Sequence, residues 1–116
     1  MSQLRKGQKS SFTQSQVYEA RNEREKNFIK AFTTLSTTQE VANFLRDLMT
    51  LSEVQEFSNR LEIAKCLVEG KSYQSIAQEI ETSTTTVTRV AQWLYSGCNG
   101  YFKVLKEEID KQKKLK

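Results

Sequence analysis

The stretch from Gly70 to Tyr101, GKSYQSIAQEIETSTTTVTRVAQWLYSGCNGY, constrains the fold of this chain more than any other segment. Apolar residues recur every three or four positions in two short runs, and polar residues 81–83 separate the runs. This pattern predicts two short helices joined by a tight turn. Ser72 and Ser83 stand where each helix would begin, and a serine hydroxyl there can accept a hydrogen bond from a first-turn amide.

The second of these helices is expected to have two different faces. One face is apolar and should be buried, and it consists of Val87, Val90, Ala91 and Leu94. The opposite face carries short polar side chains: Thr84, Thr85, Thr88 and Gln92. Hydroxyl and amide groups on an exposed helix face can bond base edges in the major groove of DNA. We therefore expect a helix-turn-helix over about residues 72–95.

Four further helices are expected around this pair. The first should span about residues 15–34, and Thr37-x-x-Glu40 and Ser52-x-x-Gln55 form capping-box patterns for the next two. Gly70 should end the third, and the last should begin at about Gly100. The chain has no proline and only four glycines, which favours helices. We predict an all-α fold of about six helices.

The apolar stripes of these helices exceed what a chain of 116 residues can bury alone. Large aromatic side chains occur on helices that need not all reach one core: Phe28, Phe32, Phe44, Phe57, Tyr101 and Phe102. Exposed apolar surface favours association by ~25 cal/mol per Å² buried. We therefore expect a symmetric homodimer, which would place two DNA-reading helices about one turn of DNA apart.

Basic residues gather toward the two ends of the chain. Residues 1–30 contain seven basic and three acidic side chains, and residues 103–116 contain six and three. Residues 31–102 contain five basic and eight acidic side chains. A basic tail is most often only a solvated terminus, but beside a helix-turn-helix it could neutralise phosphates. We expect a disordered basic tail over residues 1–14, a helical domain over 15–110 and a basic tail over 111–116.

Several classes of function are disfavoured by the composition. The chain has no histidine, no glycine-rich phosphate loop and no CxxC pair, so neither a catalytic site nor a metal site is expected. Cys66 and Cys98 are expected to be reduced and buried. No apolar run is long enough to span a membrane, and the N-terminus lacks the apolar core of a signal peptide. We expect a cytoplasmic protein that is not an enzyme.

The segment from Leu48 to Tyr101 also carries a specific set of residues: Asn59-Arg60, Gly70, Ser72-Tyr73, Ile76 and Thr86-Val87-Thr88-Arg89. With this set, the chain resembles the tryptophan repressor superfamily, and more closely its tryptophan-repressor-like YerC/YecD family of Gram-positive bacteria. The resemblance implies an intertwined all-helical homodimer that binds an operator through its fourth and fifth helices. It places Thr84, Thr85 and Thr88 at base edges, and Ser72 and Gln74 close to phosphates.

The resemblance also bears on control by a small molecule. Three residues match positions of the amino-acid pocket of tryptophan repressors: Thr50, Arg60 and Arg89. However, Val90 stands where that pocket has a glycine, and its isopropyl group should clash with bound tryptophan. We therefore expect no cofactor and no tryptophan control, while another small-molecule corepressor is left open. The alternative role for the arginines is pairing with carboxylates such as Glu56 or Glu79.

The predicted function is a sequence-specific DNA-binding transcriptional regulator, expected to be a repressor. It would bind double-stranded DNA at a palindromic operator, as a homodimer, through the helix of residues 84–95. The alternative is a helical protein-interaction or dimerisation module without sequence-specific DNA binding. The polar outer face of that helix counts against the alternative, because protein-binding surfaces usually present aromatic or aliphatic anchors.

Overall fold

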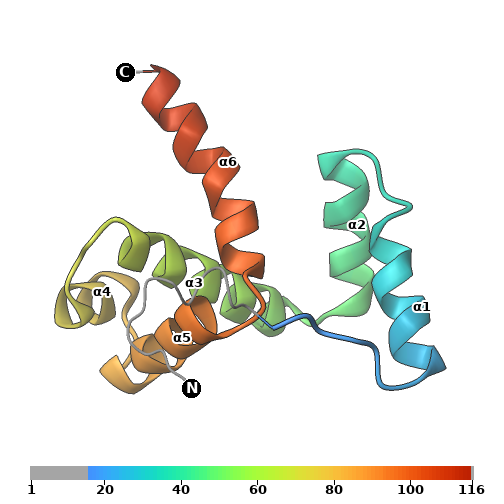
Figure 1. Cartoon of the computed structure of the whole chain (residues 1–116), viewed down its shortest axis with the longest axis horizontal. Coiled ribbons are helices and arrows are strands. Elements are labelled where there is room, and N and C mark those ends of the chain that lie inside the picture. The colour runs from blue at the N-terminus through green and yellow to red at the C-terminus, as the bar shows by residue number, and fades with distance from the viewer. Residues whose placement is uncertain (1–15, 116) are drawn as a thin grey trace. The chain divides into compact units, whose positions relative to one another are not determined.

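A computed structural model describes residues 16–115, and within this range the chain forms α-helices and no β-strand (Figure 1). The helices are α1 (Glu23–Phe32), α2 (Thr38–Leu48), α3 (Leu51–Val68), α4 (Tyr73–Ile80), α5 (Thr84–Ser96) and α6 (Gly100–Leu115). The predicted all-α class with six helices is confirmed. The tail predicted over residues 1–14 lies outside the described range.

The chain divides into two compact units, one of which is Tyr18–Ser58. This unit contains α1, α2 and the first turns of α3. The rings of Phe28 and Phe32 meet edge to face with centroids 5.2 Å apart, and those of Phe32 and Phe44 do so at 5.3 Å. Neither α1 nor α2 has a fully buried residue. The unit therefore exposes much of its apolar surface.

The second unit comprises residues 59–115 together with residues 16 and 17, and it contains the main core. The core side chains come from α3 to α6: Ile63, Ala64, Cys66, Leu67, Ile76, Ala77, Val87, Val90, Ala91, Leu94 and Leu105. The inward positions predicted for α5 are confirmed, because all four of its apolar residues are buried. This shared core positions α4 and α5 relative to α3.

Two ion pairs lie on the surface of this unit. Lys65 Nζ of α3 lies 3.0 Å from Glu108 Oε2 of α6, and the hydrogen bond from Lys65 to Glu108 raises the pKa of Lys65. Lys71 Nζ lies 3.4 Å from Glu79 Oε1 of α4, and the pKa of Lys71 is raised by its hydrogen bond to that carboxylate. The second pair ties the α3–α4 loop to the exposed side of α4.

Side-chain caps begin several helices at the predicted residues. The Thr37 Oγ1 atom accepts a hydrogen bond from the Glu40 amide at 3.1 Å, which confirms that cap of α2. Ser72 and Ser83 cap α4 and α5, as their positions in the sequence predict. Gly70 has φ +89°, the left-handed backbone predicted for the residue that ends α3.

The predicted start of the first helix was wrong. Residues 16–22 are not helical, and α1 begins only at Glu23, because Asn22 caps it by accepting a hydrogen bond from the Glu25 amide. The Glu25 carboxylate in turn accepts hydrogen bonds from the Tyr18 hydroxyl at 2.8 Å and from the Arg21 amide at 3.0 Å. These bonds fold the preceding segment back onto the helix start instead of extending the helix.

The predicted cap of α3 was also wrong. The helix begins at Leu51, and its capping box is Thr50 with Glu53 rather than Ser52 with Gln55. The Thr50 Oγ1 atom accepts from the Glu53 amide at 3.1 Å, and the Glu53 carboxylate accepts from the Thr50 amide at 2.9 Å. An ionised carboxylate accepts such bonds more strongly than a neutral amide, which favours this start.

The two cysteines differ in exposure. Cys66 is fully buried, as predicted, and burial raises the pKa of its thiol. Cys98 is exposed, which corrects the prediction that both thiols are buried, because the chain has already left α5 at Gly97. Among residues 16–115, no helix combines the length and the apolar character needed to cross a bilayer.

Candidate nucleic-acid interface

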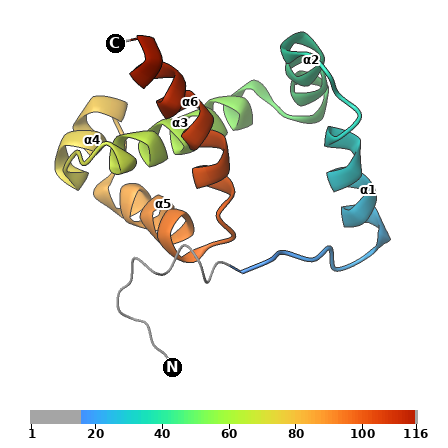
Figure 2. The same cartoon turned by 45° about the horizontal axis from the view of Figure 1, so that its top comes forward.

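Helices α4 and α5 lie side by side and are joined by the short turn of residues 81–83 (Figure 2). The Ser72 Oγ atom accepts from the Ser75 amide at 3.1 Å, and the Ser83 Oγ atom accepts from the Thr86 amide at 3.1 Å. Between the helices, Glu81 adopts a left-handed backbone with φ +64° and ψ +53°. The Thr82 amide donates to the Ala77 carbonyl at 2.9 Å and closes the turn.

Helix α5 has sharply different inner and outer faces. Val87 and Val90 have no exposed surface, and Leu94 is 2% exposed. The polar residues singled out from the sequence are all exposed: Thr84, Thr85, Thr88 and Gln92. Ser72 and Gln74, at the start of α4, are exposed as well. The helix pair therefore exposes hydroxyl and amide groups on its surface while its apolar side is held in the core.

One of these hydroxyl groups is already engaged within α5. The Thr88 Oγ1 atom donates a hydrogen bond to the Thr84 carbonyl at 2.9 Å. Because a hydroxyl oxygen also has two lone pairs, Thr88 can still accept a hydrogen bond from a base amino group. Its methyl group can also contact a thymine methyl. The bond fixes the direction of the hydroxyl and thereby favours acceptance over donation at this position.

The charge of the helix pair is slightly negative. Between residues 72 and 96, Arg89 is the single basic side chain, whereas Glu79 and Glu81 are acidic. Glu79 is paired with Lys71, and Arg89 is exposed on α5. Glu79 thus pairs with a lysine, whereas the alternative named it as a carboxylate that could pair with one of the arginines, Arg60 or Arg89. The helix pair by itself therefore carries little positive charge for attracting an anionic partner.

The three residues matched to an amino-acid pocket have different surroundings. Thr50 belongs to the unit Tyr18–Ser58, and its hydroxyl and amide both bond Glu53 in the cap of α3. Arg60 belongs to the other unit, where its Cζ atom lies 5.0 Å from the centroid of the Trp93 ring. Arg89 is exposed.

The contact between Arg60 and Trp93 was not predicted from the sequence. Trp93 directly precedes the buried Leu94 of α5 and is 45% exposed at the edge of the core. Burial also raises the pKa of Tyr101, whereas the positive charge of Arg60 lowers it. No periodic pattern links residue 60 to residue 93, so the sequence carries no signal for this contact.

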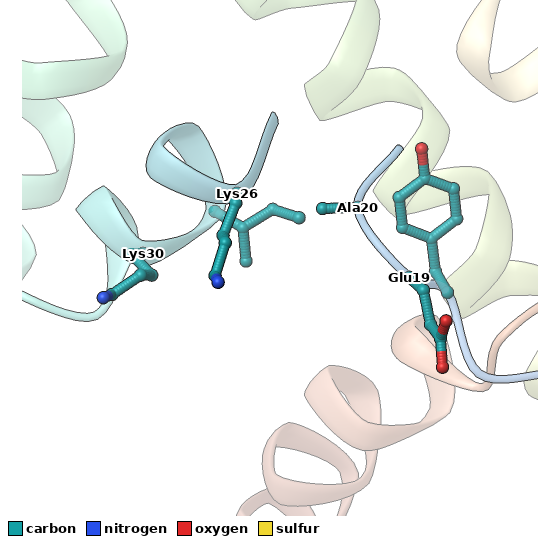
Figure 3. A pocket seen from close by; sticks show the side chains of 6 residues that line it. Glu19, Ala20, Lys26 and Lys30 are labelled. Atoms are coloured by element: carbon teal, nitrogen blue, oxygen red, sulfur yellow. The ribbon is translucent and has the colours of Figure 1, made fainter. Parts of the chain in front are cut away.

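Two surface pockets accompany these features. One, with a volume of about 630 Å³, is largely apolar and is lined by Leu61, Trp93, Tyr101 and Val104 among others. The other lies in the unit Tyr18–Ser58 and has a volume of about 440 Å³. Lys26 and Lys30 reach this second pocket from α1, and Glu19 and Ala20 from the segment before α1 (Figure 3). Because both lysine and glutamate side chains line this pocket, its charges do not indicate one class of ligand.

The chain belongs to the family described as Trp repressor protein, whose pattern it matches over residues 23–109. Two solved structures resemble it closely. A TrpR-like protein from Eubacterium eligens is 31% identical, with a TM-score of 0.70, over 75% of this chain and 90% of that one. A provisionally named Trp repressor from Staphylococcus aureus is 34% identical, with a TM-score of 0.70, over 76% and 88%. No curated protein matches the chain.

This family places the chain among helix-turn-helix DNA-binding regulators rather than among enzymes. The matched range includes all of α1 to α5 and the first part of α6. The exposed outer face of α5 is thus part of a fold that is used for regulation.

Proposed function

We propose that the chain is a sequence-specific transcriptional regulator, acting as a repressor, that binds a palindromic operator as a homodimer through α5. One observation carries the proposal: the exposed polar face of α5 lies opposite a fully buried apolar face. A helix held in this way can enter the major groove without exposing its core. The Thr84, Thr85 and Thr88 side chains are the proposed base contacts, and Gln92 extends the same face.

The phosphate contacts are assigned to groups around α5. Ser72 and Gln74 are exposed at the start of α4, where free amides also favour an anion. Because the helix pair itself has little positive charge, we assign the larger electrostatic share to the basic ends of the chain. Removing residues 1–14 should therefore reduce the slope of log affinity against log salt more than it reduces sequence preference.

The homodimer is supported by exposed apolar side chains in both units. The exposed fractions are 46% for Phe28, 45% for Leu48, 44% for Phe57, 38% for Leu61 and 57% for Val104. Single exposed apolar residues are common, but a set of this size favours association. Sedimentation equilibrium should give a mass twice that of the 13.4 kDa chain. A monomer at micromolar concentration would contradict this part of the proposal.

We also propose that tryptophan does not control DNA binding. Val90 is fully buried, so space beside Arg89 at the α5 backbone is filled by a core side chain. The guanidinium of Arg60 already lies against the Trp93 ring. Binding of a free indole at Arg60 would have to displace this contact. DNA affinity measured with and without millimolar L-tryptophan should be the same within twofold.

The test of DNA reading is selection of bound fragments from a random duplex pool with the purified full-length protein. We expect an enriched palindrome. Thr85→Ala combined with Thr88→Ala should then reduce affinity for this sequence by about tenfold or more, since each neutral hydrogen bond contributes about 0.5–1.5 kcal/mol and two are lost. Affinity for random duplex should change less than twofold. Thr33→Ala, outside the helix pair, is the matched control and should change neither affinity.

Two results would contradict the proposal. If no sequence is enriched while the protein is a dimer, the alternative of a protein-interaction or dimerisation module is favoured. If the double threonine variant lowers affinity for selected and random duplexes equally, the threonine face contacts the backbone rather than the bases.

A further inference from the structure

The contact between Arg60 and Trp93 joins α5, which bears the proposed base contacts, to α3, which contributes to the same core. Arg60 is half-buried on α3, and its Cζ atom lies 5.0 Å from the centre of the Trp93 ring on α5. A guanidinium within about 6 Å of an indole centroid is attracted to the face of the ring. The attraction is stronger for indole than for smaller aromatic rings and requires a defined position of both side chains.

The position of this contact on each helix allows it to restrict the orientation of α5. On α3, Arg60 lies one turn before the buried residues Ile63 and Ala64, and on α5, Trp93 lies directly before the buried Leu94. The buried residues fix the distance between the two helices. A contact at the edge of the core also resists rotation of α5 about its own axis.

Such a rotation matters for base recognition. The side-chain surface of a helix lies about 5–6 Å from its axis, so a turn of about 20° displaces an outer side chain by roughly 2 Å. Hydrogen bonds tolerate only about 0.5 Å around their best donor–acceptor distance. A small rotation of α5 would therefore remove Thr85 and Thr88 from bonding distance while leaving phosphate contacts largely intact.

We propose that the contact between Arg60 and Trp93, which we call the latch, holds α5 in its base-reading orientation. The aromatic ring of this contact belongs to the chain itself rather than to a bound ligand. This inference rests on the proposed DNA-binding function. Arg60 and Trp93 are positioning residues, because they act on DNA through α5. The latch predicts that sequence preference depends on both residues although neither is a proposed base contact.

The test uses four variants of the full-length protein on the selected palindrome and on random duplex at one salt concentration. Arg60→Gln removes the cation, Trp93→Leu keeps an apolar side chain without a ring, and Trp93→Phe keeps a ring. Arg24→Gln, on an exposed position of α1, removes the same charge as Arg60→Gln and is the matched control. Thermal melting followed by circular dichroism verifies that each variant is folded.

We expect Arg60→Gln and Trp93→Leu each to weaken binding to the palindrome by about three- to tenfold, in line with one partly exposed cation–π contact. The double variant should lose little more affinity for the palindrome than either single variant, because both substitutions remove the same contact. Trp93→Phe should stay within about twofold of the wild type. Random-duplex affinity should not fall further than it does in Arg24→Gln.

The intrinsic fluorescence gives an independent readout, because Trp93 is the single tryptophan of the chain. Arg60→Gln should change its emission and its quenching by acrylamide, and Arg24→Gln should not. If Arg60→Gln and Trp93→Leu lower palindrome affinity additively, or leave the palindrome-to-random ratio unchanged, the latch is refuted. If the wild type selects no sequence, the proposed function itself fails and the latch fails with it.

Discussion

The turn between α4 and α5 contains a residue whose replacement should raise the stability of the protein. Glu81 has φ +64° and ψ +53°, a left-handed backbone in which its Cβ is crowded, and glycine has no such atom. A non-glycine residue in this region costs about 1–2 kcal/mol. We predict that Glu81→Gly stabilises the protein.

The size of the effect follows from two opposing contributions. Relief of the left-handed strain favours the folded variant by about 1–2 kcal/mol, whereas the greater freedom of glycine in the unfolded chain opposes it by about 0.4–1 kcal/mol. The net gain should be about 0.5–1 kcal/mol. For a chain of this length, 1 kcal/mol corresponds to roughly 3–5 °C, so the Tm should rise by about 2–4 °C.

The assay is thermal unfolding by circular dichroism at a fixed protein concentration, because association makes the Tm concentration-dependent. Glu81→Gln is the matched control: it removes the same charge but keeps the Cβ, and its Tm should change by less than about 1 °C. Glu81→Asn should fall between them, since asparagine tolerates this backbone. A rise in Tm with Gln as large as with Gly would refute the backbone argument and assign the effect to charge.

Three further predictions concern stability. A Cβ at Gly97 would overlap the Trp93 carbonyl, so Gly97→Ala should cost about 1–3 kcal/mol in urea unfolding, whereas Gly100→Ala meets open space and should be neutral within about 0.5 kcal/mol. Equal costs would contradict this. Val87→Ala should cost about 1–3 kcal/mol and Thr85→Ala under about 0.5 kcal/mol, and a reversed order would mean that α5 faces the other way. Hydrogen bonding from Arg21 lowers the pKa of Glu25 to about 2, below its ordinary 4.5. The stability it contributes is therefore complete above about pH 4.5 and is lost as pH falls toward about 2. Glu25→Gln should show less loss over that window by thermal melting, and an unchanged pH profile would count against the assignment.

The fold could largely be predicted from local signals. The serine caps of α4 and α5, the left-handed glycine after α3 and the inward stripe of α5 depend on residues close together in the sequence. The errors arose where two local signals competed. Thr50-x-x-Glu53 and Ser52-x-x-Gln55 overlap, and the structure uses the pair with the carboxylate. At α1, an asparagine cap begins the helix later than its composition suggested.

The candidate site was predictable only in part. The outward position of Thr84, Thr85 and Thr88 follows from the helical period once the inner face is known. The contact of Arg60 with Trp93 joins residues that are far apart in the sequence, and no local pattern carries it. The left-handed backbone of Glu81 could not be predicted from the sequence either, because the turn lacks the glycine that usually marks such a backbone.

The different exposure of the two cysteines makes the unmodified protein suitable for site-directed labelling. Cys66 has no exposed surface and a raised thiol pKa, so it should react slowly, whereas Cys98 is exposed just beyond the end of α5. A maleimide or methanethiosulfonate reagent should therefore attach at one position without mutagenesis. In a homodimer, the distance between spin labels on the two Cys98 residues would report the separation of the two α5 helices, with and without DNA.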